Sequence, residues 1–287
     1  MNKKDAINIY CGNIEEFSRR QRIAEAQRVG MVNELLDVLV AESTAESAEE
    51  VYGELLTTLP ASTCEDRARL CMKLYASSRF GTQMRKSCFF GENIAPGSHG
   101  KVSLVRNSYN ERAFSHFSAI IRRPKEVIAP SFDAACEEVY DNRSEFCILP
   151  IENAQSGRLF GFYSMLDRYE LKICAVCEPD SDDNGDGGVK YALVGRSVPD
   201  RISKSARWSF EFSVISDSGS DFSDISRVSA VFGARLMKID SLPVEYDGGL
   251  QKYYFTFGLP EASIPAFDLF LSEEYSRYTA VGMYPTV

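Results

Sequence analysis

The chain has 287 residues, 44% apolar and 25% charged, a globular balance that excludes wholesale disorder. Its 32 Lys and Arg against 41 Asp and Glu give a formal net charge of −9, which argues against nonspecific binding to nucleic acid or an anionic membrane. No apolar run approaches the ~20 residues that cross a bilayer, and the first residues lead into no signal-peptide core. We therefore expect a cytoplasmic protein without nucleic-acid or membrane partners.

The residues before Gly91 predict an all-α domain over 1–92. Apolar residues recur there at helical spacing, namely Val32, Leu35, Leu36, Leu39 and Val40. A second helix over Ala48–Leu59 ends at Pro60, and the spacing of Ser62 and Glu65 indicates a capping box before a third. The glycine- and proline-containing stretch from Gly91 to Gly100 is the first credible linker.

After the linker, short β runs alternate with helices over 101–197. Strands are expected at Lys101–Val105, Glu126–Ala129, Phe146–Ile151, Leu171–Cys177 and Val189–Gly195. Helices are expected at Ala113–Ile121, capped from Ser108, and at Ser131–Tyr140. Such alternation predicts an α/β domain whose parallel strands are joined by right-handed crossovers.

The remaining residues, 205–287, follow a third pattern. Strands and helices are expected in the order βαββαβ, over Trp208–Val214, Phe222–Phe232, Ala234–Ser241, Lys252–Gly258, Ile264–Leu271 and Thr279–Tyr284. This order predicts an α+β ferredoxin-like unit, an antiparallel sheet with both helices on one face.

Two short motifs carry weak metal signals. Asp180-x-Asp182-x-Asn184-Gly185 matches the opening of an EF-hand loop, but Tyr191 stands where the bidentate Glu belongs, so a solvated acidic loop is favoured over calcium. Cys174 and Cys177 have zinc or redox spacing without a second pair. Because residues three apart on a strand face opposite ways, we expect two packed thiols. Eight cysteines are expected to be reduced, two histidines nearly exclude chemistry built on several imidazoles, and no metal or cofactor is expected.

The most informative stretch is Leu149–Gly157. A buried strand ends there and presents Glu152, Asn153, Ser156 and Gly157 where a parallel sheet places its ligand, beyond the carboxyl ends of its strands. A following helix could offer its N-terminal amides to a carboxylate. A plain strand-to-helix turn with Asn and Ser as caps explains the same residues.

Leu149–Gly157 resembles the "PIEN…S.G" signature of prephenate dehydratases, and Asn107–Ala113 is similar to that family's segment after the first strand. Ala234–Pro243 and Val281–Pro285 resemble the "ESRP" and "LG.YP" segments of its regulatory ACT domain. The N-terminal helices, most clearly Arg69–Arg79, resemble a chorismate mutase domain. Over nearly its whole length the chain thus resembles the bifunctional chorismate mutase–prephenate dehydratase family.

This resemblance implies a fold and a site. The fold would be a mutase-like helical domain, a single lobe of a periplasmic-binding-protein-like dehydratase domain, and a ferredoxin-like ACT domain. The ligand-binding candidates are Ser108, Asn110, Glu152, Asn153, Ser156, Gly157 and Lys190. Val189, however, stands at the family's catalytic threonine, and a valine has no hydroxyl with which to donate a proton. Residues 178–188 are also too few to hold the second lobe, which would leave the cleft open to water.

The outer domains show similar departures from the family. The mutase-like candidates are Arg20, Arg22, Glu50 and Gln83. The regulatory candidates are Asp221, Phe222, Asp240 and Ser241. Leu242 replaces the arginine of "ESRP", and Ser220–Ser223 replaces the family's phenylalanine-contacting "GALV", so feedback by phenylalanine is not expected.

We therefore expect a noncatalytic homologue from the field of phenylalanine biosynthesis. It would bind an aromatic metabolite, namely chorismate, prephenate or phenylalanine, or a protein partner. The alternative is an active mutase or dehydratase with an atypical site. A homodimer is expected, because mutase-like helices and ACT sheets in such relatives bury apolar faces between subunits.

Overall fold

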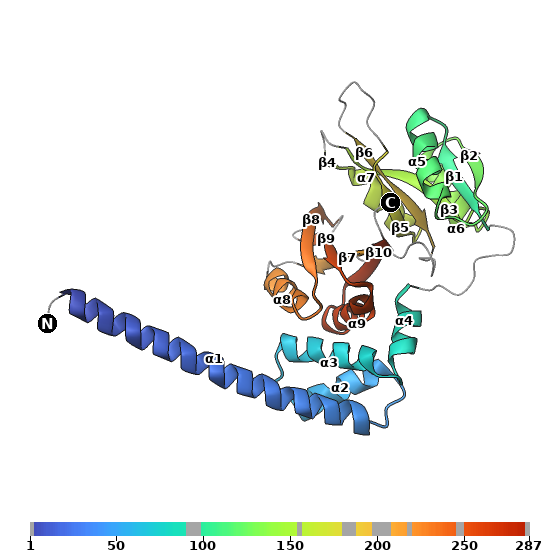
Figure 1. Cartoon of the computed structure of the whole chain (residues 1–287). Coiled ribbons are helices and arrows are strands. Elements are labelled where there is room, and N and C mark those ends of the chain that lie inside the picture. Colours follow the sequence, from blue (N-terminus) through green and yellow to red (C-terminus); the bar gives the residue numbers. More distant parts are fainter. Residues whose placement is uncertain are drawn as a thin grey trace.

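A computed structural model describes residues 3–89, 99–153, 157–179, 188–196, 208–216, 220–244 and 250–284. It is a mixed α/β protein in which a helical N-terminal region precedes one large sheet (Figure 1). Within these ranges no helix is both long enough and apolar enough to cross a membrane.

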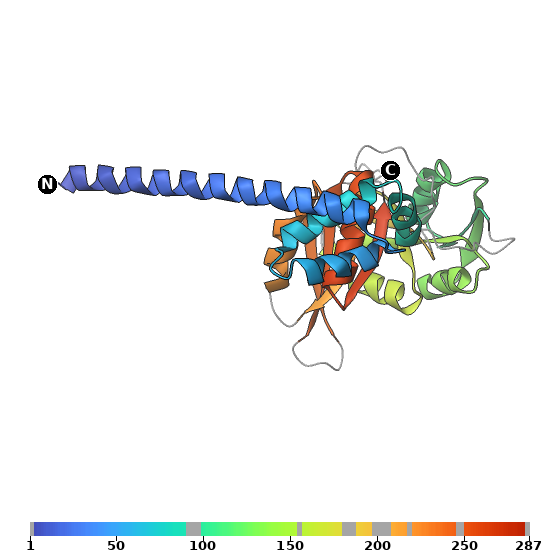
Figure 2. The ribbon, with the colours of Figure 1, turned by 90° about the horizontal axis from the view of Figure 1, so that it is seen from below.

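The N-terminal region consists of α1 (Lys3–Glu42), α2 (Ala48–Thr58), α3 (Cys64–Ala76) and α4 (Gly81–Phe89). Val32 and Leu36, in the C-terminal half of α1, are buried in one apolar cluster with residues of α2 and α3. The N-terminal half of α1 projects away from the rest of the described chain (Figures 1 and 2). The apolar residues that predicted this helix, from Val32 to Val40, lie in the half that packs against α2 and α3.

Two helices begin one residue away from the predicted caps. Thr63, not Ser62, caps α3, and its hydroxyl accepts from the amide of Asp66, whose carboxylate accepts from the amide of Thr63. Asn107, not Ser108, caps α5 (Ser108–Ser118). In both cases the short polar side chain directly before the first helical turn reaches the third amide of that turn.

The middle of the chain forms the first half of the sheet. Its elements are β1 (Lys101–Val105), α5, β2 (Lys125–Ala129), α6 (Phe132–Tyr140), β3 (Phe146–Asn153), β4 (Gly157–Arg158), α7 (Phe160–Arg168), β5 (Lys172–Cys177) and β6 (Val189–Gly195). β1 is parallel to β2 and to β3, as the alternating pattern predicts. β6 follows β5 without an intervening helix and is antiparallel to both β3 and β5. The physical reason is the short connection 178–188, since a parallel crossover needs a dozen or more residues.

The last part of the chain forms the second half of the sheet. Its elements are β7 (Trp208–Ser216), α8 (Ser220–Ser229), β8 (Arg235–Pro243), β9 (Gln251–Leu259), a 3₁₀ turn (Glu261–Ser263), α9 (Ile264–Glu274) and β10 (Tyr278–Tyr284). The strands pair antiparallel in the order β10-β7-β9-β8. Their core is aromatic: the ring of Phe212 lies 5.2 Å from Phe255, 5.9 Å from Phe257 and 5.8 Å from Phe267.

The two halves are one continuous sheet, ordered β2-β1-β3-β6-β5-β10-β7-β9-β8, with β4 beside β3. Separate α/β and ferredoxin-like units were predicted, but β5 pairs parallel with β10 at Ile173 and Gly282. Gly282 has no Cβ, and an added one would lie 2.6 Å from the carbonyl oxygen of Ile173. The seam between the halves thus depends on a glycine.

Side chains of helix α7 and of the N-terminal helices contact the C-terminal part of the chain. Tyr163 on α7 donates to the buried carboxylate of Glu211 on β7 and stacks on Tyr254 of β9, with ring centroids 3.6 Å apart. In the N-terminal region, Arg67 on α3 forms an ion pair of 2.7 Å with Glu274 on α9. The helical region and both halves of the sheet are therefore connected by side-chain contacts.

Candidate functional site

The predicted site lies at the carboxyl ends of β1 and β3. In the antiparallel register of β3 and β6, Asn153 pairs with Val189 and Glu152 pairs with Lys190. The segment that begins β6 therefore lies directly beside the end of β3. This is the arrangement that brings residues 152–153 and 189–191 together, although 35 residues or more separate them in sequence.

The first turn of α5 forms the neighbouring edge of the site. The side chain of Asn107 accepts from the amide of Asn110 at 2.8 Å. Asn110 is fully buried, and its Nδ2 donates to the carbonyl of Val105 at 2.6 Å, while its Oδ1 has no hydrogen-bond partner within the described residues. Asn110 therefore fixes the turn between β1 and α5. Ser108 is exposed at the start of the helix.

Lys190 and Tyr191 are consecutive residues of β6, so their side chains face opposite sides of the sheet. Lys190 is half-buried, and its ammonium group has no ion pair with any residue of the described ranges. Tyr191 is 6% exposed. Burial raises its pKa, the nearby Tyr109 and Cys177 add to this shift, and the Arg112 guanidinium opposes it. Arg112 itself lies over the ring of Tyr109, 5.2 Å from the ring centroid.

Lys238 enters the site from the far end of the sheet. Its ammonium lies 3.3 Å from Glu152 and 3.5 Å from Asp240. β8 is many strands away from β3, but the sheet curls so that β8 returns toward β4 (Figure 1). Sequence reasoning missed Lys238 as a site residue, because nothing in its local pattern signals contact with a strand 86 positions earlier. The end of β3 is therefore partly covered by the C-terminal half.

The structure describes Asn153, Gly157, Ser156 and the acidic stretch only in part. The backbone of Asn153 pairs with Gly157 on β4, which turns the chain back along β3. Ser156 lies outside the described residues, as do residues 180–187 of the acidic stretch that resembles half an EF-hand loop.

The four mutase-like candidates do not converge within one chain. Arg20 pairs with Glu16 on its own helix, and Arg22 donates to the carbonyl of Ser18 at 3.3 Å. Glu50 accepts from the amide of Glu46 at 2.7 Å. Gln83 is exposed on α4.

A buried ion cluster instead occupies the space between α1 and α3. The carboxylate of Asp66 is fully buried and accepts from Arg28 at 2.7 Å and from Arg69 at 3.0 Å. Burial alone would raise the pKa of Asp66, but the hydrogen bonds from Arg28 and Thr63 outweigh it and the pKa is lowered. The carboxylate is therefore held charged and serves to dock α1 on α3.

The regulatory candidates divide between core and surface. Phe222 packs edge-on against Tyr253, with ring centroids 4.4 Å apart, and so belongs to the core. Asp240 neighbours Lys238, and Ser241 is exposed on β8. Asp221 is part of α8.

The cysteines of β5 are packing residues, although one geometric expectation is wrong. We predicted that Cys174 and Cys177 face opposite ways, but both join the same apolar cluster, because the ladder between β5 and β6 is irregular between Ile173 and Ala175. Burial raises the pKa of the Cys177 thiol to about 12. In the part of the chain that the structure describes, no three His, Cys, Asp or Glu side chains gather as a metal site.

No protein-family model matches the chain, and no curated protein matches its sequence. Among solved structures, it is similar to a prephenate dehydratase from Streptococcus mutans, with a TM-score of 0.51 and 16% identity over 64% of this chain and 97% of that one. It also matches a prephenate dehydratase from Staphylococcus aureus (TM-score 0.47, 8% identity, 64% of this chain and 100% of that one). A quorum-quenching acylase, GqqA, matches at TM-score 0.49 and 16% identity, over 65% and 95%. The likeness to the first of these shows a prephenate dehydratase-like fold.

Proposed function

We propose that this protein is a noncatalytic relative of the prephenate dehydratases that binds an aromatic carboxylate beyond the ends of β1 and β3. The observation that carries the proposal is the pairing of Val189 with Asn153. In the family that the sequence resembles, a catalytic threonine occupies the position of Val189. A valine there holds the backbone geometry but supplies no proton to a leaving group.

The missing lobe supports the same proposal. β5 and β6 are neighbours in the sheet, and only residues 178–188 separate them in the chain. Among the described residues, β8 reaches over the site through the contact of Lys238 with Glu152 on β3, and these two side chains remain 32% and 28% exposed. A site this accessible does not exclude water, which is where closing active sites obtain much of their rate.

Binding still has support at this edge. The Lys190 ammonium, the Ser108 hydroxyl and the N-terminal amides of α5 are donors on neighbouring elements. A carboxylate near a helix N-terminus is favoured by the unpaired amides and by the helix dipole. The exposed ring of Tyr109, beside Arg112, provides a surface for an aromatic body.

We expect prephenate to bind without being turned over. Calorimetry should show binding that weakens about tenfold, near 1.4 kcal/mol, in Lys190→Gln, because a charge-assisted contact is lost. Arg168→Gln, which removes an exposed arginine elsewhere on the same half, is the matched control and should bind as the parent does. Absorbance of phenylpyruvate in the same mixture should not rise.

Either of two results would contradict this proposal. Phenylpyruvate formation that disappears in a variant carrying both Glu152→Ala and Asn153→Ala would establish the active-enzyme alternative. Absence of binding heat from prephenate with the parent chain would remove the ligand-binding half.

The finer domain assignment belongs to the same proposal. We assign α1–α4 to a chorismate mutase-like domain and the unit β7-α8-β8-β9-α9-β10 to an ACT-like domain. The helical composition of residues 3–89 and the βαββαβ order support these assignments.

We also propose that two copies pair through α1. Tyr10, Ile14 and Phe17 are 67%, 65% and 70% exposed and form one stripe at helical spacing. The same face of α1 carries Arg28, which pairs with Asp66 on α3. This face of α1 is thus covered by α3 near Arg28 and is exposed to solvent at Tyr10, Ile14 and Phe17. An isolated helical half of this kind is marginal in water unless a partner covers it.

The charges beside the stripe favour a second copy as that partner. Glu15 and Glu16 precede Phe17, and Arg19 and Arg20 follow it. Two such helices laid antiparallel about this point place each acidic pair opposite the other copy's basic pair. A two-fold axis requires this self-complementarity, because the same patch must meet itself.

Light scattering should therefore give twice the chain mass of 32.1 kDa. Phe17→Glu should give the monomer mass, because a charge replaces an apolar contact on the two-fold seam. Ile23→Glu is the matched control: Ile23 is 51% exposed but lies on the opposite side of α1, so this variant should stay dimeric. A monomeric parent chain, or a dimeric Phe17→Glu, would contradict the pairing.

A further inference from the structure

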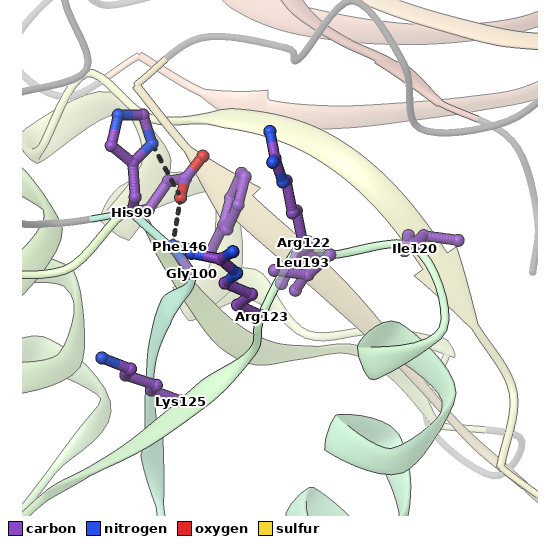
Figure 3. Close-up of a pocket in the computed structure, with 10 residues that line it drawn as sticks. His99, Gly100, Ile120, Arg122, Arg123, Lys125, Phe146 and Leu193 are labelled. Atoms are coloured by element: carbon purple, nitrogen blue, oxygen red, sulfur yellow. Dashed lines mark hydrogen bonds and ion pairs between the residues drawn. The ribbon is translucent and has the colours of Figure 1, made fainter.

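A cavity opens at the opposite edge of the sheet from the candidate site. It has a volume of about 530 Å³ and lies at the amino-terminal ends of β1, β2 and β3, beside the loop that joins α5 to β2. Figure 3 shows the side chains that surround it. This volume is within the range of ligand pockets for small molecules.

One wall of the cavity is apolar. Phe146 at the start of β3 and Leu193 on β6 are buried and contribute to the lining, together with half-buried Ile120 and Ile121. In Figure 3, Phe146 is seen between His99 and Arg122, while Lys125 points away from them. The wall provides an apolar surface that a hydrocarbon side chain of a ligand would cover.

A carboxylate stands at one end of this wall. Glu145 is only 13% exposed in its side chain, its Oε2 accepts from the amide of Gly100 at 2.6 Å, and His99 lies 3.8 Å away. These are the two dashed contacts in Figure 3. Across the described residues, no lysine or arginine is within ion-pair distance of Glu145. A carboxylate this buried gains from a cation, and among the described residues only His99, when protonated, lies within ion-pair distance of it.

Positive charge also borders this cavity. Arg122 and Arg123 line the cavity, and neither has an ion pair with a residue that the structure describes. Arg123 has a φ of 58°, a left-handed conformation that is uncommon for a side-chain-bearing residue. The turn is held against Gly100, whose φ is 74° and where an added Cβ would lie 2.3 Å from the Arg123 carbonyl oxygen. The acid and the two guanidinium groups are thus kept in one cavity without neutralising each other.

From this arrangement we infer that the cavity binds a small zwitterion, an α-amino acid with an apolar side chain. The ligand's ammonium would pair with Glu145, its carboxylate with Arg122 and Arg123, and its side chain would cover Phe146 and Leu193. A ligand that carries both charges satisfies both the acid and the guanidinium groups, whereas a simple anion leaves Glu145 without a cation. This inference is independent of the proposed function, because the two sites lie at opposite edges of the sheet.

Calorimetry with L-phenylalanine tests the inference on the full chain. We expect L-phenylalanine to bind, and both 3-phenylpropanoate, which lacks the ammonium, and 2-phenylethylamine, which lacks the carboxylate, to bind at least tenfold more weakly. Arg122→Gln and Glu145→Gln should each weaken L-phenylalanine at least tenfold. Arg143→Gln, which removes an exposed arginine outside the cavity, should bind as the parent does.

The variants also separate this site from the one at the carboxyl edge. Lys190→Gln should leave L-phenylalanine binding unchanged, and Arg122→Gln should leave prephenate binding unchanged. Because Glu145 holds Gly100, Glu145→Gln is accompanied by a thermal melt, and Arg122→Gln, at an exposed side chain, tests the site without that contact. Three results would overturn the inference: no binding of L-phenylalanine, equal binding of 3-phenylpropanoate, or unchanged binding in Arg122→Gln.

Discussion

Glu211→Ala is expected to lower the free energy of unfolding by about 4 kcal/mol, because it removes the carboxylate that accepts from two buried hydroxyls and opens a cavity. Glu211 on β7 is fully buried. Its carboxylate accepts from Tyr163 on α7 and, at 2.7 Å, from Tyr284 on β10. The Glu211 side chain thus links helix α7 to strand β10, which lies at the seam between the two halves of the sheet. Urea unfolding followed by circular dichroism gives the measurement.

The matched variants separate the hydrogen bonds from the packing. Glu211→Gln keeps the shape but replaces one acceptor oxygen by an amide nitrogen, so about half of the loss is expected. When Tyr163→Phe and Tyr284→Phe are already present, Glu211→Leu should cost much less than it does alone, since no donor is then left unpaired. If Glu211→Leu lowers the free energy of unfolding by the same amount in both backgrounds, the carboxylate and the two hydroxyls have no interaction energy.

Gly282→Val is expected to cost about 3 kcal/mol through overpacking at the seam of the sheet. A Cβ at Gly282 would lie 2.6 Å from both the Cβ and the carbonyl oxygen of Ile173. The carbonyl is backbone, so no side-chain rotation relieves this contact, and the pairing of β5 with β10 must open. We therefore expect the two halves to lose their cooperative unfolding.

The single tryptophan makes this loss measurable. Trp208 is buried on β7 and reports only the C-terminal half by fluorescence, whereas circular dichroism reports the whole chain. The two urea transitions should coincide in the parent and separate in Gly282→Val. Gly53→Ala is the control: it lies in α2 with no atom within 4 Å of the added Cβ, and should stabilise by about 0.5–1 kcal/mol. Coincident transitions in Gly282→Val would show that the seam does not couple the halves.

Local pattern was enough for most of the elements. The strand predicted at Lys101–Val105 has those bounds, and the helix predicted over Ala48–Leu59 is α2, Ala48–Thr58. The reason is that helical and strand periods, and the residues that end them, act within a few positions of each other. The same reasoning located the candidate site at the end of β3, because a buried strand that ends in polar residues is itself a local signal.

Partners distant in the chain lay beyond that reasoning. The direction of β6, the contact of Lys238 with Glu152, and the acceptor role of Glu211 between two tyrosines each depend on how elements distant in the chain pack together. The cavity at the amino-terminal edge is similar: Arg122, Glu145 and Leu193 come from three separate segments, none of which has an unusual local pattern.

By itself, then, the sequence determined the helical beginning, the alternation of strands and helices, and the βαββαβ order. Only the tertiary structure decided that two predicted units share one sheet, and that Val189 lies beside Asn153. The physical reason is that strand pairing depends on the length of the connections and on close backbone approach. In this chain the short connection 178–188 sets the direction of β6, and Gly282 allows the close approach of β5 and β10.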